Sequence, residues 1–295
     1  LPLVLDALGS PDPSLRGAAL AVVPLVPGGS ATAAITERLA SLDPQGQVGL
    51  IGALAERGDR TARGPVEALA SSRDEAVRTA AIDALARLGD ASTVERLAHA
   101  AANERGAARD AARRSLVLLA CPGVDAAILA AAARGDPVER TELLRAAAER
   151  RSEGAAAALL EAAGDTDERV RLAALEGLAT LADPASYGGL VGLAARISAP
   201  GEATAVEKAL LEVAKGLPDL AARVEPLILA IGRASGVPRV TLLRVLGSSG
   251  GERALAAVRA DLGHSDEIVR RSALEVLAAW PDDAAASELL NLAGS

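Results

Sequence analysis

The sequence predicts an all-α protein built from repeated helical hairpins. Half of the 295 residues are apolar, yet the chain contains no Phe, no Met, one Tyr and one Trp. Its apolar residues are mainly Ala, Leu and Val, and Ala, Leu, Arg and Glu are strong helix formers. Alternating runs of β-branched and aromatic residues, which are typical of strands, are missing. A helical pattern that recurs at a fixed spacing extends the prediction to the whole chain.

The recurring pattern is clearest at residues 165–183, which read DTDERVRLAALEGLATLAD. Asp165 and Asp167 precede a predicted helix, and an Asp in that place accepts hydrogen bonds from the first free backbone N–H groups. The apolar residues that follow are three and four positions apart, so they fall on one face of the helix. They are Val170, Ala174, Leu175, Leu178 and Leu181.

Arg171 lies just off this apolar face and marks the repeat. Equivalent positions are 31 residues apart for five steps, and then 36, 32 and 31 residues apart. The residues four and seven positions after each marker form two apolar columns, and Arg113 alone breaks the first. A period kept over so many units predicts that neighbouring units stack through Ala and Leu faces. The marker positions are Arg16, Gln47, Arg78, Arg109, Arg140, Arg171, Glu207, Arg239 and Arg270.

Each unit is predicted to hold a short first helix (A), a turn, and a second helix (B) that carries the marker. Asp, Pro and Gly occupy the turns, and Gly or Pro follows most B helices, as expected at helix ends. The chain begins partway through the first A helix, and residues 284–293 resemble an A helix without its B helix. We therefore expect both ends to continue a longer array or to be capped. The complete A helices are expected near 30–42, 64–72, 92–103, 124–134, 155–163, 187–197, 219–233 and 251–262.

Three B helices begin with the pattern Asp-x-x-Val-Arg, at Asp74–Arg78, Asp167–Arg171 and Asp266–Arg270. This pattern resembles the short bacterial HEAT-like repeat, also called the phycobilisome-lyase HEAT-like repeat. The resemblance implies a right-handed α-solenoid of about nine HEAT-like helical hairpins, a single array over residues 1–295. The units would be about 1–28, 29–59, 60–90, 91–122, 123–152, 153–184, 185–217, 218–249 and 250–282, with a partial unit at 283–295.

Two units depart from the pattern. The second repeat has Gln45 to Val48, reading QGQV, where Asp-x-x-Val-Arg belongs. The seventh repeat has an insertion at residues 197–201 and places Glu207 in the Arg column. A longer turn between the A and B helices of the seventh repeat could bend the array or form a lip. Neutral variation in a tolerant surface loop is the simpler interpretation.

Asp residues four positions before the marker Arg are the most regular polar feature. We expect each Asp to cap helix B and to pair with Arg along or across the stack, because the two residue types occur together. A ladder that grips an acidic partner is the functional alternative. The pairs are Asp12/Arg16, Asp74/Arg78, Asp136/Arg140, Asp167/Arg171 and Asp266/Arg270.

A second row, five residues after each marker, lies on the polar side of helix B. If B helices line the inner curve, as the resemblance implies, this row faces the concave groove. The row is basic in the fourth and fifth repeats and then mostly acidic, a pattern suited to an extended partner. An ordinary solvated helix face is the alternative. The row begins Ala21, Gly52, Asp83, and its candidate binding residues are Arg114, Arg145, Glu176, Glu212, Arg244 and Glu275.

Composition and spacing argue against several other functions. The net charge of −8 opposes general nucleic-acid binding. A single cysteine, Cys121, excludes an intrachain disulfide, and His99 and His264 show no metal-ligand spacing. A base-excision enzyme would need more aromatic residues than Tyr187 and Trp280. No apolar run reaches the roughly 18–20 residues of a membrane span. We therefore predict no catalytic residue, metal or cofactor.

The sequence predicts a non-catalytic protein-binding scaffold or assembly module that uses its concave face. The partner would be another protein, through an extended or helical segment. Family resemblance leaves one enzymatic alternative, a lyase-type or chaperone-like subunit acting on a cofactor-bearing protein. A structural spacer inside a larger protein is the other alternative. The compartment stays open, with the cytoplasm as the first expectation and a removed leader or upstream region as the alternative. Fold alone does not separate these functions.

Overall fold

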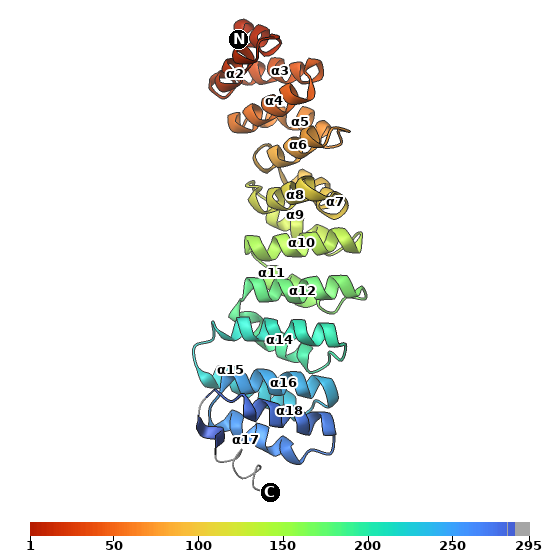
Figure 1. The fold of residues 1–295 in the computed structure, drawn as a ribbon, viewed down its shortest axis with the longest axis vertical. Coiled ribbons are helices and arrows are strands. Elements are labelled where there is room, and N and C mark those ends of the chain that lie inside the picture. The colour runs from red at the N-terminus through yellow and green to blue at the C-terminus, as the bar shows by residue number, and fades with distance from the viewer. Residues whose placement is uncertain (282, 287–295) are drawn as a thin grey trace. The chain divides into compact units, whose positions relative to one another are not determined.

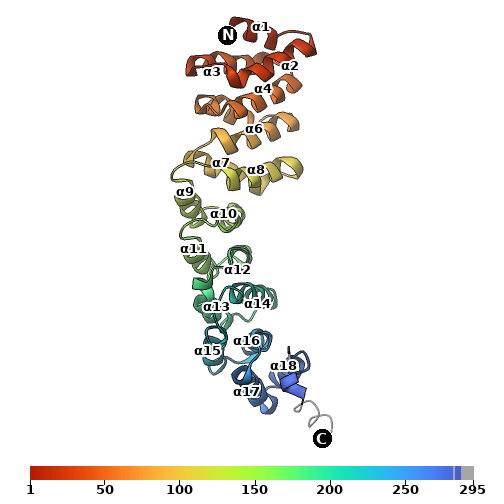
Figure 2. The same cartoon turned by 90° about the vertical axis from the view of Figure 1, so that its left-hand side faces the viewer.

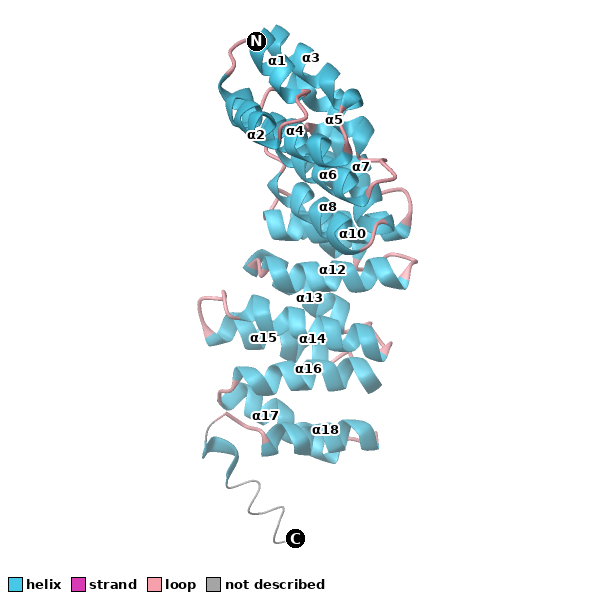
Figure 3. Ribbon diagram, turned by 45° about the horizontal axis from the view of Figure 1, so that its top comes forward, coloured by secondary structure: helices cyan, strands magenta, loops and turns pink. Residues whose placement is uncertain are grey.

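The protein is all-α throughout the part that the structure describes. The computed structural model describes residues 1–281 and 283–286, and over these residues it contains eighteen α-helices, short 3₁₀ helices and no strand (Figures 1 and 3). The predicted fold class, an α-solenoid of helical hairpins, is confirmed. The chain divides into two compact units, Leu1–Arg150 (unit 1) and Arg151–Ser295 (unit 2). That residues 1–295 form one continuous array remains a prediction.

Unit 1 contains five helical hairpins, in each of which an A helix is followed by a B helix. In four of these hairpins the A helix packs on its own B helix, as α7 does on α8, and in the second hairpin the 3₁₀ helix Glu37–Ser41 that follows α3 makes the contact with α4. The A helices are α1 (Pro2–Leu8), α3 (Gly29–Thr36), α5 (Arg63–Leu69), α7 (Val94–Asn103) and α9 (Val124–Ala132). The B helices are α2 (Pro13–Val22), α4 (Pro44–Arg57), α6 (Glu75–Leu88), α8 (Gly106–Leu118) and α10 (Pro137–Arg150).

The described residues of unit 2 form four more hairpins with the same plan. In Figure 2 its helices α13, α15 and α17 form one layer, and α14, α16 and α18 form the other. The A helices are α11 (Ala155–Ala162), α13 (Tyr187–Ala194), α15 (Leu220–Ile231) and α17 (Glu252–Ala260). The B helices are α12 (Glu168–Leu181), α14 (Pro200–Ala214), α16 (Gly236–Ser249) and α18 (Glu267–Ala278).

Within each unit the B helices form the more closely packed layer. In unit 1, α6 packs directly on α4 and on α8, and in unit 2, α14 packs on α12 and on α16. Successive A helices touch one another far less. Closer spacing of one layer is what the inner side of a curved stack requires. The B helices therefore line the inner side of each unit. Their surface that faces away from the A helices, called the B-helix face below, is where a binding groove is expected.

All of the second apolar column of the repeat and most of the first are buried in the core of the two units, although Leu274 of the first column is 43% exposed. Ile51 and Ile82 in unit 1, and Leu175 and Leu243 in unit 2, are at most 1% exposed. Burying such a side chain stabilises the fold by roughly 1.5–3 kcal/mol. Because Ala, Leu and Val fill most core positions, helices approach closely and each hairpin depends on its neighbours.

The insertion in the seventh repeat does not lengthen the turn between its A and B helices, contrary to the expectation of a longer turn. Residues 197–199 lie in this turn, and Pro200 and Gly201 begin α14. Helix α14 begins at Pro200, and the turn before it covers residues 195–199, matching the turn at 163–167 between α11 and α12. Proline suits the first turn of a helix, because the N–H it lacks would be unpaired there. The predicted terminal helix at 284–293 falls largely outside the described residues.

Candidate functional site

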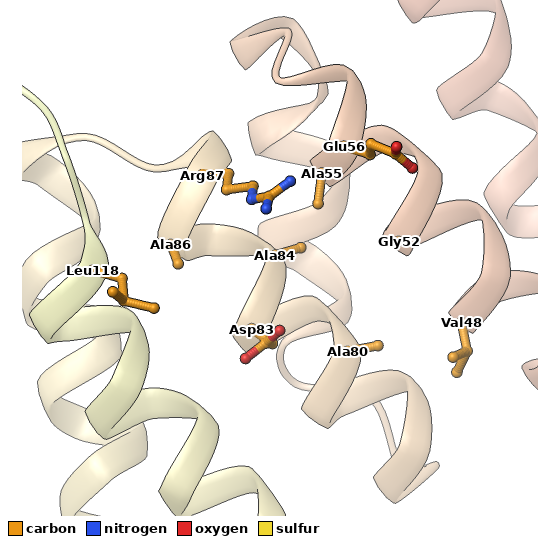
Figure 4. A pocket seen from close by; sticks show the side chains of 10 residues that line it. All are labelled: Val48, Gly52, Ala55, Glu56, Ala80, Asp83, Ala84, Ala86, Arg87 and Leu118. Carbon is orange, nitrogen blue, oxygen red and sulfur yellow. The ribbon is translucent and has the colours of Figure 1, made fainter. Parts of the chain in front are cut away.

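The B-helix face of unit 1 carries a hollow between successive helices. The hollow has a volume of about 640 Å³ and is formed by helices α4, α6 and α8 (Figure 4). Its lining includes Gly52 and Asp83, which belong to the row predicted to face the groove. The lining residues are Val48, Gly52, Ala55, Glu56, Ala80, Asp83, Ala84, Ala86, Arg87 and Leu118.

Small side chains create this hollow. Gly52 lies on the exposed side of α4, and a Cβ atom added there would meet no atom within 4 Å. Ala55 on α4 and Ala80 on α6 continue the low floor on either side of it. Val48 also lines a second cavity of about 370 Å³ between α2 and α4, so the two hollows adjoin. The result is a trough along the B-helix face of unit 1.

Leu118 gives the trough an apolar edge. It ends α8, and 64% of its surface is exposed, unlike the buried leucines of the repeat columns. A single exposed leucine is ordinary on a protein surface. Leu118, however, borders an apolar cavity, and that combination is what marks surfaces that bind partners.

Three charged side chains stand at the rim of the hollow. Asp83 accepts a 3.2 Å hydrogen bond from Arg114 on the next B helix. Glu56 and Arg87 occupy corresponding positions on α4 and α6, at one end of the hollow (Figure 4). Neither makes a hydrogen bond or ion pair with another side chain in the described part of the chain. The rim therefore offers one carboxylate and one guanidinium to a ligand.

Arg145, another predicted groove residue, is tied to a buried carboxylate. Glu142 on α10 is 6% exposed and accepts two hydrogen bonds from Arg113, of 2.8 and 2.6 Å. Arg145 donates a third, of 2.9 Å. These bonds explain the polar residue in the apolar column, because Arg113 neutralises a carboxylate that burial would otherwise make costly. Arg145 is thus partly structural, whereas Arg114 is a surface residue.

In unit 2 the same row is charged, and three of its four side chains, those of Glu212, Arg244 and Glu275, pair with charged neighbours. Glu176 is exposed, and Glu212 accepts hydrogen bonds of 2.7 and 2.8 Å from Lys215. Arg244 lies 3.9 Å from Glu207 and 4.0 Å from Glu275, beside a cavity of about 260 Å³. Burial raises the pKa of Glu207, and the charge of Arg244 opposes the rise.

The Asp residues of the predicted ladder lie at the N-terminal ends of the B helices. Each accepts a hydrogen bond from the backbone N–H two residues later, which satisfies one of the free donors of a helix end. A hydrogen bond from the Arg169 side chain also lowers the pKa of Asp167 to about 2. The capping bonds are Ser14 to Asp12, Ala76 to Asp74, Val138 to Asp136, Arg169 to Asp167 and Ile268 to Asp266.

The marker arginines bond to the turn before helix B, where pairing with the upstream Asp was expected. Arg78 donates to the carbonyl oxygen of Ser72 at 2.7 Å, and Arg171 to that of Asp165 at 2.9 Å. Arg140 and Arg270 donate likewise to Ala132 and His264. These arginines fasten the turn to its own helix.

Several marker arginines also reach a carboxylate of the following repeat. Arg78 donates to Glu104 at 3.2 Å, and Arg171 holds the buried Glu202 with a closest approach of 2.6 Å. In unit 2, Arg239 grips Asp261, which is 2% exposed, through hydrogen bonds of 2.6 and 2.9 Å. Bidentate contacts of this kind fix one repeat against the next.

The two histidines and the cysteine lie in separate segments of the chain, and each histidine is hydrogen-bonded to a neighbouring residue. His99 bonds to Glu139 at 2.8 Å, and His264 accepts the Asp266 backbone N–H at 3.0 Å. Cys121 is a free, half-buried thiol. Among the described residues, no group of three His, Cys, Asp or Glu side chains is arranged to hold a metal ion. Within the same residues, every helix is too short or too polar to cross a membrane.

Sequence reasoning found the row but not the hollow within it. Gly52 was in the predicted row, and its Cβ-free position was visible in the sequence. Val48, Ala80 and Leu118 carried no signal of their own, because Val, Ala and Leu fill this sequence everywhere. A glycine and several alanines at outward positions of successive B helices would have been the clue.

Comparison with known proteins identifies the class of repeat. Residues 32–117 match the family model of HEAT repeats. This stretch contains every residue that lines the hollow of about 640 Å³ except Leu118. A comparison with curated proteins found no match. The match confirms the predicted resemblance to HEAT repeats over these residues.

Solved structures share the fold at low sequence identity. The karyopherin Kap121p, bound to the extreme C-terminus of the protein phosphatase Cdc14p, has a TM-score of 0.57 and 11% identity, covering 93% of this chain and 37% of that one. Kap95p, from a structure with RanGDP, has a TM-score of 0.51 and 14% identity, covering 99% and 49%. The chain thus spans about half of Kap95p and about a third of Kap121p.

A third structure is the complex of CpcE and CpcF of phycocyanin lyase from Nostoc sp. PCC7120. Its matching chain has a TM-score of 0.37 and 19% identity, covering 78% of this chain and 93% of that one. The likeness to the two karyopherins concerns the fold, and function has to be argued from the residues of the site.

Proposed function

We propose that the chain is a non-catalytic protein-binding module that receives a segment of another protein in the trough of unit 1. The observation that carries the proposal is the cavity of about 640 Å³ on the B-helix face, floored by small apolar residues and bordered by the exposed Leu118. Cavities of this size with an apolar lining and few polar groups are typical of binding sites. The karyopherin Kap121p, which shares the fold, is bound to a segment of another protein in its own structure.

The experiment that tests this proposal fills the cavity without disturbing the fold. Gly52→Leu places a side chain where the structure has open space, and a leucine inside a helix is favourable. Gly192→Leu is a matched control, because Gly192 is also an exposed helical glycine with nothing within 4 Å of an added Cβ atom. Wild type and both variants serve as bait in a lysate of the source organism.

We expect a protein that is captured by the wild type and by Gly192→Leu but lost with Gly52→Leu, in quantitative mass spectrometry. Equal capture of all proteins by the three baits would contradict the proposal. The lyase-type subunit and the structural spacer, also predicted from the sequence, remain predictions without a specific observation in their favour.

A further inference from the structure

We propose that the segment received by unit 1 is an amphipathic α-helix, with a basic residue placed against Glu56 and an acidic residue against Arg87. This inference rests on the proposed function and specifies its partner. Four features of the trough support it: its length, its lack of hydrogen-bonding groups, its small side chains and its rim charges.

The length of the hollow matches two turns of a helix. Its lining on α4 runs from Val48 to Glu56, and on α6 from Ala80 to Arg87. At 1.5 Å per residue these stretches are about 12 and 10.5 Å long. The apolar anchors of a bound helix at positions i, i+3 or i+4, and i+7 span about 10.5 Å. Three anchors therefore fit along the hollow.

The floor offers a ligand almost no hydrogen bonds. Val48, Gly52, Ala55, Ala80 and Ala84 have no polar side-chain atoms, and they lie in helices, whose backbone groups bond within the helix. An extended segment lying there would leave its own N–H and C=O groups without partners, at a cost of about 1–3 kcal/mol for each buried group. A helix satisfies these groups internally, so the floor favours a helix over an extended chain.

Small residues also let a helix come close. Helices pack with axes about 8–10 Å apart, and the distance depends on the side chains at the contact. Gly52 on α4 and Ala80 on α6 present little or no side chain to a ligand. The apolar side chains of a ligand helix can then enter the hollow, and Leu118 covers one end of them.

The charged side chains at the rim indicate where the ligand helix carries residues of opposite charge. Asp83 is already bonded to Arg114. Glu56 and Arg87 have no partner among the described side chains, and both are exposed at the same end of the hollow. A ligand with a Lys or Arg near Glu56 and an Asp or Glu near Arg87 complements both charges. Such complementarity contributes more to specificity and association rate than to affinity.

Two matched peptide libraries displayed on phage test this inference. Both randomise the same number of positions, one within a helix-favouring Ala/Glu/Lys host and the other within an extended, proline-containing host. Selection uses the full wild-type chain, with Gly52→Leu as counter-selection and Gly192→Leu as control. We expect enrichment from the helical library, with Leu, Ile or Val at i, i+3 or i+4, and i+7. Enriched peptides should bind Gly52→Leu at least about tenfold more weakly, a difference of about 1.4 kcal/mol.

A second selection tests the charges. On Glu56→Lys, the basic residue of the enriched helices should be replaced by an acidic one, and an unchanged preference would overturn the charge assignment. Enrichment from the extended library, blocked by Gly52→Leu, would overturn the helix and leave the proposed function standing. If no peptide from either library is blocked by Gly52→Leu, both the helix and the trough as a binding site are overturned.

Discussion

The B-helix faces of the two units use the same positions for different purposes. In unit 1 the row begins with the small residues Ala21 and Gly52, and the surface beside Gly52 is hollow, with charged residues from Asp83 onward. In unit 2 the corresponding surface carries Glu212, Arg244 and Glu275, which bind neighbouring charges. The hairpins beneath are alike, with buried Leu and Ile columns in both units. The scaffold is therefore uniform, and outward residues that leave the core untouched set what each surface can bind.

The two units also share a stabilising device below the surface. Each contains a nearly buried carboxylate held by an arginine from the preceding repeat: Glu142 with Arg113 in unit 1, and Asp261 with Arg239 in unit 2. In a stack, each repeat contacts only its neighbours, so the loss of such a pair should be felt locally. The following experiments use that locality to separate the units.

The largest effect is expected from Arg239→Met. It leaves Asp261, 2% exposed, without its bidentate partner, and removing one member of a buried ion pair costs roughly 3–5 kcal/mol. In hydrogen exchange followed by mass spectrometry, protection should fall in α16, α17 and α18, whereas α4 and α6 should keep theirs. Arg271→Met, at a side chain that is 81% exposed, is the control and should change little. Equal loss of protection in both units would show that the two units unfold together.

Much of this architecture could be predicted from the sequence, because the repeat supplies the same information nine times. The A helix expected at 155–163 is Ala155–Ala162 in the structure, and that expected at 124–134 is Val124–Ala132. Capping Asp residues and apolar columns act over a few residues, so a local pattern is enough to place them. The longer turn considered for the seventh repeat is not formed, and the sequence does not show which element takes up added residues. The next A helix, α15, has 12 residues against 8 in α13.

The candidate site was less accessible to sequence reasoning. The sequence predicts binding by charged residues of the row, yet Arg145 holds the buried Glu142. The hollow depends instead on the side chain that Gly52 lacks. The partner of a long side chain such as Arg239 is 22 residues away in the chain, and no local pattern specifies it. Cavities arise from what several helices leave empty together, which is a property of packing in three dimensions.

A medium effect should distinguish the two arginines of the groove row in unit 1. Arg145→Glu brings a second carboxylate to Glu142, which is 6% exposed, so we expect unit 1 to lose roughly 1–3 kcal/mol of stability. Arg114→Glu faces the exposed Asp83 and should cost less than about 1 kcal/mol. Urea unfolding of the two single variants measures the difference. Similar losses for both would mean that Arg113 alone satisfies Glu142.

A smaller and opposite effect is expected from the two glycine variants. Replacing a mid-helix glycine by leucine favours the helix by roughly 0.5–1 kcal/mol, because the unfolded chain loses freedom. Gly52→Leu, inside α4, should therefore raise the urea midpoint of unfolding, and Gly192→Leu, in the last turn of α13, should raise it less, although only Gly52→Leu fills the hollow of unit 1. A loss of stability with Gly52→Leu alone would reveal that the hollow is less open than the structure shows, and would disqualify this variant as a binding probe.

The smallest effect concerns the pH dependence of unit 2. Burial raises the pKa of Glu207 above its ordinary value of 4.5, with Arg244 opposing. The folded protein therefore holds this proton more tightly than the unfolded chain, and stability falls as pH rises from 4.5 through the folded-state pKa. Glu207→Gln removes this loss. Its urea midpoint should exceed that of the wild type slightly at pH 7 and equal it at pH 4. A lower midpoint at pH 7 would mean that the attraction of Arg244 outweighs the cost of burial, and that the charged row of unit 2 stabilises its own surface.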